Sequence, residues 1–68
     1  MEYNGHDIDV EVTRDVALGI VRTFHGTYTI CQDGRVLFTG AVPCGLKTPE
    51  DAMTMANQVA QRWVDERR

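Results

Sequence analysis

Four side chains of the types that bind zinc are spread along this 68-residue sequence. Two histidines, His6 and His25, and two cysteines, Cys31 and Cys44, are the nitrogen and sulfur donors that a tetrahedral zinc site takes. Structural zinc sites usually draw their ligands in closely spaced pairs, but no two of these residues lie within five positions of each other. We therefore predict no metal site and no bound cofactor.

Cys44 is the candidate for a reactive thiol, with His6 or His25 as its general base. A reactive cysteine has to ionise readily, which a helix N-terminus or a nearby cation favours. Cys44 lies near Lys47 and four residues before the expected helix cap, but nothing in the sequence brings a histidine to it. A thiol- or metal-dependent enzyme is an alternative, and the main prediction is a chain with no catalytic residues.

A row of carboxylates, Asp7, Asp9 and Glu11, occupies alternate positions near the N-terminus. Paired carboxylates can bind divalent cations or act as acid and base. Along an extended strand, however, alternate side chains stand about 6.5 Å apart and face water. We interpret the row as a solvated face that discourages edge-to-edge association and that could also receive a basic partner.

The charge balance limits the classes of partner. The formal net charge is −3, and nucleic-acid binding depends mainly on cationic contacts to phosphates. Nucleic acid is therefore a poor candidate, and that alternative needs several cations on one face, namely Arg22, Arg35, Lys47 and Arg62. No apolar run approaches the roughly 20 residues that cross a bilayer, and the N-terminus lacks a signal-peptide pattern. We expect a cytoplasmic protein with no membrane partner and with reduced cysteines.

A first strand is predicted from Asp7 to Thr13, because Ile8, Val10 and Val12 alternate with polar residues. The following segment, from Arg14 to Val21, has no clean alternation and is expected to hold a turn and the entry to a second strand.

A β-hairpin is predicted between residues 27 and 39. Residues 27–31 and 35–39 are rich in β-branched and apolar types, and Asp33-Gly34 between them is typical of a type I′ turn. A two-residue turn sets the register, which pairs Ile30 with Leu37, Tyr28 with Thr39, Cys31 with Val36 and Thr29 with Phe38. His25 and Gly26 are expected to form a bulge in the long second strand.

A C-terminal helix is predicted after the loop from Pro43 to Lys47. Thr48 suits the N-cap, Pro49 the first helical position, and the acids Glu50 and Asp51 the positive end of the helix dipole. Its apolar stripe contains Ala52, Ala56, Val59, Ala60 and Trp63. The predicted fold is α+β: a single domain over residues 1–68, with a three-stranded antiparallel sheet packed on one C-terminal helix in the order β-β-β-α.

The predicted sheet has more apolar surface than one helix can cover. In the register above, Ile30, Leu37 and Tyr28 share the covered side with Phe24. The other side carries a candidate interaction patch of Thr29, Cys31, Val36 and Phe38. Exposed apolar surface of this kind usually marks a protein contact. Alternatively, the Arg14 to Val21 segment or the Pro43 to Lys47 loop folds over it. We predict a non-catalytic protein–protein interaction module that acts through this face or an edge strand, with an unknown protein partner or a second copy.

Two resemblances accompany these patterns. Residues 1–8, the strand at Tyr28 to Ile30 and the helix from Ala52 to Arg68 resemble short bacterial hypothetical proteins of β-β-β-α layout, which implies that layout and no known activity. The stretch with Pro43, Cys44, Gly45, Thr48, Glu50, Asp51 and Ala52 is similar to the loop and helix start of HicB-like antitoxin domains. Those domains dimerise and block a toxin, so the similarity implies an antitoxin-like, partner-blocking function as an alternative.

Overall fold

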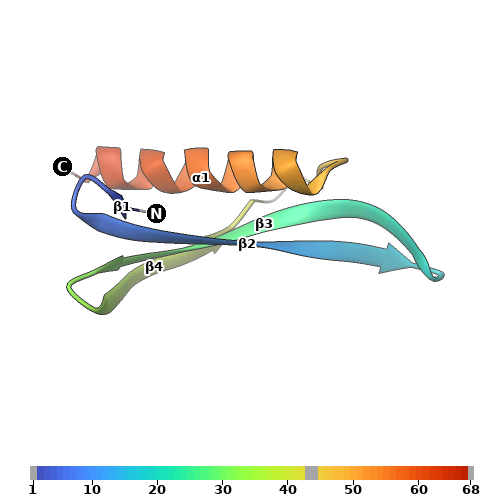
Figure 1. Cartoon of the computed structure of the whole chain (residues 1–68), viewed down its shortest axis with the longest axis horizontal. Coiled ribbons are helices and arrows are strands. Elements are labelled where there is room, and N and C mark those ends of the chain that lie inside the picture. Colours follow the sequence, from blue (N-terminus) through green and yellow to red (C-terminus); the bar gives the residue numbers. More distant parts are fainter. Residues whose placement is uncertain (1, 43–44, 68) are drawn as a thin grey trace.

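The computed structural model describes residues 2–42 and 45–67. The elements are β1 (Glu2–Tyr3), β2 (His6–Ala17), β3 (Ile20–Gln32), β4 (Arg35–Ala41) and α1 (Pro49–Glu66). The strands form one antiparallel sheet in the order β1-β2-β3-β4, and α1 packs on one face of it (Figure 1). The predicted α+β fold is confirmed, with the short β1 as an additional strand at the edge.

Each strand is joined to the next by a two-residue turn that ends in glycine. Asn4-Gly5, Leu18-Gly19 and Asp33-Gly34 all have positive φ at both positions. That is the geometry of type I′ turns, whose twist matches that of paired strands. The Asp33-Gly34 turn confirms the prediction, whereas the Asn4-Gly5 turn was not predicted.

The core lies between α1 and the facing side of β2 and β3. Ile8 pairs with Ile30 and Val10 with Tyr28, and these side chains point towards the helix. The helix contributes its buried stripe of Ala52, Ala56, Ala60 and Val64. Small helix residues let the sheet approach closely, which is why Gly26 lies directly against the start of α1.

The helix begins where the local signals placed it. The hydroxyl of Thr48 accepts a hydrogen bond from the backbone N–H of Asp51 at 3.1 Å, and Pro49 occupies the first turn. At the other end, Trp63 packs against the core and its ring stacks on Phe38 with centroids 5.4 Å apart.

The predicted register of β3 and β4 is right next to the turn and wrong beyond it. Cys31 pairs with Val36, but Ile30 pairs with Phe38 instead of Leu37. Leu37 is therefore the extra residue of a β-bulge, which shifts every later pair by one position. Consequently Thr29 faces Thr39, and Tyr28 faces Gly40.

The bulge predicted at His25 and Gly26 is also wrong. Those residues pair regularly with Thr13 and Val12, and the irregularity of β3 lies nearer the tip of the hairpin. There Asp15 pairs with Thr23 while Val16 pairs with Val21, so Arg22 is the extra residue.

The sheet face away from α1 is mostly polar. In β3 the threonines at positions 23, 27 and 29 alternate with residues that point towards the helix. Across from them, β2 places its predicted row of Asp7, Asp9 and Glu11, all exposed. The expected apolar outer face is therefore limited to the end of the hairpin near β4, where Cys31 pairs with the exposed Val36.

Of the two segments expected as an alternative cover, the one from Arg14 to Val21 does not fold over that outer face. The segment from Arg14 to Val21 completes the hairpin of β2 and β3 instead. After β4, Leu46 forms a two-way backbone bridge with Phe24 at 2.7 and 2.8 Å, which keeps the chain at the edge of β3. Pro43 and Cys44 lie outside the described residues.

Candidate functional site

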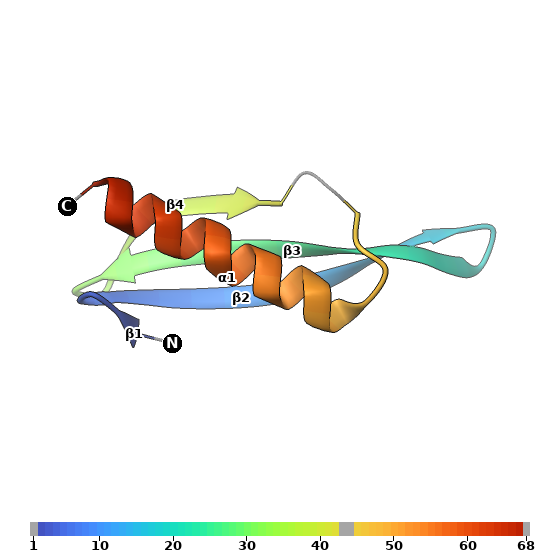
Figure 2. The same cartoon turned by 90° about the horizontal axis from the view of Figure 1, so that it is seen from above.

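The hairpin of β2 and β3 extends well past the beginning of α1 (Figure 2). The molecule is 42 Å long, whereas an 18-residue helix spans about 27 Å. The radius of gyration is 12.9 Å, compared with about 11 Å for a compact domain of this length. We call residues 13–25, which form the overhanging part, the hairpin arm.

The helix-side face of the hairpin arm has no helix above it. Side chains alternate along β2, so Val16 lies on the same face as the core residues Ile8 and Val10, with the exposed Arg14 between them and it. Val16 is 59% exposed, and its cross-strand partner Val21 is also exposed. Apart from Arg14, the helix-side face of the arm is therefore apolar beyond the point where α1 stops covering the sheet.

Leu18 is the most exposed large apolar residue of the described chain, at 95%. It occupies the first position of the type I′ turn with φ of 54°. Non-glycine residues rarely adopt this conformation, and Asn or Asp tolerates it better than Leu. Leucine is therefore unfavourable here for two reasons: its backbone has positive φ, and its apolar side chain is exposed to water. An apolar contact at the tip would offset these costs.

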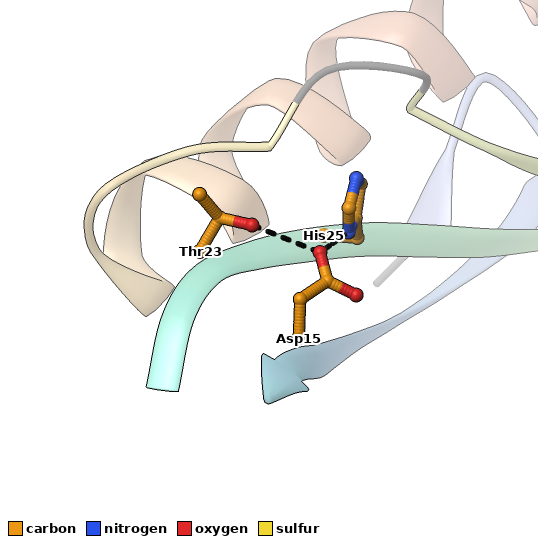
Figure 3. Close-up of polar contacts among 3 residues, drawn as sticks. All are labelled: Asp15, Thr23 and His25. Atoms are coloured by element: carbon orange, nitrogen blue, oxygen red, sulfur yellow. Dashed lines mark hydrogen bonds and ion pairs between the residues drawn. The ribbon is translucent and has the colours of Figure 1, made fainter. Parts of the chain in front are cut away.

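A polar cluster stabilises the other face of the hairpin arm. Figure 3 shows Asp15 of β2 between Thr23 and His25 of β3. One carboxylate oxygen of Asp15 accepts a hydrogen bond from the Thr23 hydroxyl at 2.9 Å and also contacts Nδ1 of His25. This contact holds the two strands together across the face and engages the one acidic side chain of the arm.

The same cluster resembles the His–Asp part of a catalytic triad, because a carboxylate on Nδ1 would leave Nε2 available as a base. Among residues 2–42 and 45–67 no third member accompanies the pair, since the nearby hydroxyl of Thr23 donates to Asp15 itself. Residues 2–42 and 45–67 also form no pocket that could hold a substrate. What the described residues of this arrangement do is position the two strands against each other.

The predicted interaction patch is not a single surface. Thr29 and Cys31 lie on the sheet face away from α1, and Val36 pairs with Cys31 there. Phe38 lies on the helix side instead, against Trp63 and Tyr28. The prediction failed at Phe38 because the bulge at Leu37 reversed the face of the residues after it.

Of the candidate metal and thiol residues, His6, His25 and Cys31 are not assembled into a site. His6 Nδ1 lies 3.0 Å from the carbonyl oxygen of Asn4, and His25 is engaged by Asp15. Within the two described ranges, no three His, Cys, Asp or Glu side chains lie close enough to hold a metal ion. Cys44, the candidate thiol, falls outside those ranges.

The four cations considered for nucleic-acid binding do not all gather in one place. Arg22 belongs to the hairpin arm, whereas Arg35 follows the turn at the opposite end of β3. Separately, no helix within residues 2–42 and 45–67 combines the length and apolar character needed to span a bilayer.

Sequence reasoning missed the exposed apolar residues of the hairpin arm, which are Val16, Leu18, Ile20 and Val21. The bulge at Arg22 shifts Val21 by one position, and Arg14 interrupts the apolar alternation of β2 just before Val16. A usable signal was present in Leu18-Gly19, because a glycine in the second position is typical of a type I′ turn even when leucine precedes it.

No protein-family model, curated protein or solved structure matches this chain. The two resemblances noted from the sequence therefore stay predictions.

Proposed function

We propose that this chain is a non-catalytic protein–protein interaction module that docks through the helix-side face and tip of the hairpin arm. The observation that carries the proposal is the mismatch between sheet and helix, which leaves Val16, Val21 and Leu18 uncovered. It keeps the predicted function but moves the binding surface from the Thr29, Cys31, Val36 and Phe38 patch to the other end of the hairpin.

Physical chemistry supports a partner for the hairpin arm. A two-stranded ribbon is at best marginally stable in water on its own, and it gains stability when a hydrophobic face packs against something. Val16, Val21 and Leu18 are exposed on the helix-side face and tip of the arm, and Ile20 is exposed on its other face. Clustered exposure of this kind is typical of interaction sites on small domains.

The chain provides a matched pair of positions for the test. Val16 in the hairpin arm is 59% exposed, and Val36 near the β4 turn is 62% exposed. Both are valines in strands, so Val16→Asp and Val36→Asp cost similar amounts in folding and differ mainly in location.

The experiment is affinity capture with a tagged chain from a cytoplasmic extract of the native host, the compartment expected from the sequence. Circular dichroism first verifies that both variants are folded. We expect the wild type and Val36→Asp to retain the same protein, either a host protein or the untagged chain, and Val16→Asp to lose it. Retention by Val16→Asp, loss with both variants, or no specific capture by the wild type would each refute docking through the hairpin arm.

A further inference from the structure

We infer that the partner of the hairpin arm is a second copy of this chain. In this two-fold dimer, each arm lies on the uncovered helix-side face of the other copy's arm, in line with the start of that copy's α1. This inference rests on the proposed function, because it names the occupant of the same surface. Its support comes from the layer geometry, the distribution of charge and the surface area of the molecule.

The layers of the fold have the right thickness for this arrangement. Stacked sheets lie about 10 Å apart, and a helix with its side chains is about 10–12 Å across. A second hairpin arm placed on the uncovered face would therefore occupy the same layer as α1 and continue it end to end. Two-fold symmetry makes the contact reciprocal, so each arm is covered by the other.

The length of the overhang also fits. From Val12, beneath the start of α1, to Leu18 at the tip, an extended strand covers about 20 Å. Two such arms lying antiparallel overlap over their full length, which brings the tip of each to the first turns of the other copy's helix. Those turns expose an apolar side chain, Met53, to which a tip leucine is suited.

Charge favours the same contact. The hairpin arm carries exposed Arg14 and Arg22, and its one acid, Asp15, is engaged by His25 and Thr23. The first turn of α1 carries exposed Glu50 and Asp51. The cationic arm of one copy would thus meet the acidic helix start of the other, and complementary potentials of this kind guide association and fix orientation.

An alternative dimer, in which the sheet faces away from α1 stack on each other, is disfavoured by charge. It would bring the Asp7, Asp9 and Glu11 rows of two copies together, and facing like charges are repulsive.

The surface area is sufficient for a modest dimer. The chain exposes 4806 Å², whereas a compact monomer of 7.7 kDa exposes about 4300 Å². If each copy buried this excess of roughly 500 Å², the contact would total about 1000 Å², near the lower limit for specific interfaces. We therefore expect a reversible dimer, with a contact at the small end of specific interfaces.

Sedimentation equilibrium from low micromolar to millimolar concentration tests the dimer. We expect the wild type and Val36→Asp to dimerise alike, and Val16→Asp to raise the dissociation constant at least about tenfold. Leu18→Asn should do the same without harming the fold, because asparagine suits the turn. Equal dimerisation of Val16→Asp and Val36→Asp would overturn the arm-to-arm arrangement.

A charge exchange tests which surfaces meet. Arg22→Glu and Glu50→Arg each place like charges across both reciprocal contacts, so each variant alone should dimerise more weakly than the wild type. In a heterodimer of the two variants, both contacts regain opposite charges. An equimolar mixture should therefore associate more tightly than either variant alone, and a mixture no tighter than its components would contradict the assigned contact.

The two proposals fail in different ways. A chain that stays monomeric throughout, while capture still loses a host protein with Val16→Asp alone, would refute the dimer and leave the proposed function standing. A monomer that also captures nothing would refute both.

Discussion

The backbone of Gly26 lies so close to α1 that a β-carbon at this position would stand 2.7 Å from the β-carbon of Ala56. Real β-carbons do not approach each other to this distance, so any side chain here would push the helix away from β3. This contact sets how closely helix and sheet pack at the base of the hairpin arm.

Replacing Gly26 with alanine should therefore destabilise the fold. We expect a loss of about 1–3 kcal/mol in the free energy of unfolding, the usual cost of overpacking, even though alanine is the better strand residue. Urea denaturation measures it. Thr29→Ala, further along β3 and on the outer face, is the control, and equal stability of the two variants would contradict the close packing.

The Thr48 cap makes a separate contribution. Thr48→Ala removes the hydroxyl that accepts from the N–H of Asp51, and we expect a loss of about 1 kcal/mol in thermal or urea unfolding. Thr54 is an exposed threonine inside α1, so Thr54→Ala is the matched control and should be neutral or slightly stabilising. If both variants lose the same amount, the cap is not the cause.

The N-terminal turn is tied to the end of the helix by Tyr3. Its hydroxyl donates to the carboxylate of Asp65, with oxygen distances of 2.8 and 3.1 Å. We expect Tyr3→Phe to cost about 1 kcal/mol and to speed amide hydrogen exchange in β1 and at His6, while the hairpin of β2 and β3 keeps its protection. Glu66→Gln, an exposed neighbour of Asp65, should leave exchange unchanged. Unchanged exchange in Tyr3→Phe would show that the bond does not hold β1.

The conformational cost at Leu18 can be measured apart from association. At concentrations where the chain is monomeric, Leu18→Asn should raise the free energy of unfolding by about 0.5–1 kcal/mol, because asparagine tolerates positive φ better than leucine. Leu37→Asn changes an exposed leucine that has no positive φ and should give no such gain. A monomeric Leu18→Asn protein less stable than the wild type would argue against strain at the tip.

Local patterns in the sequence were enough to predict the fold class. The alternation of Ile8, Val10 and Val12, the Asp33-Gly34 turn and the Thr48 cap each depend on residues only a few positions apart. Interactions between residues this close in sequence can be predicted without coordinates, since a turn or a helix cap depends only on a few neighbouring residues.

The face on which each side chain lies was decided by contacts between distant residues. Phe38 stacks on Trp63, 25 positions away, and the bulge at Leu37 is what allows it to do so. The sequence alone favoured an unbroken register, which put Phe38 on the wrong face.

The binding surface depended on tertiary structure in the same way. The sequence determined that a sheet would pair with a single amphipathic helix and that some apolar surface would remain uncovered. Only the packing of α1 on Gly26 decided where that surface lies, because the start of the helix relative to the strands leaves Val16, Leu18 and Val21 beyond its cover. No local pattern reports this offset, since it arises from how two elements of unequal length are placed against each other.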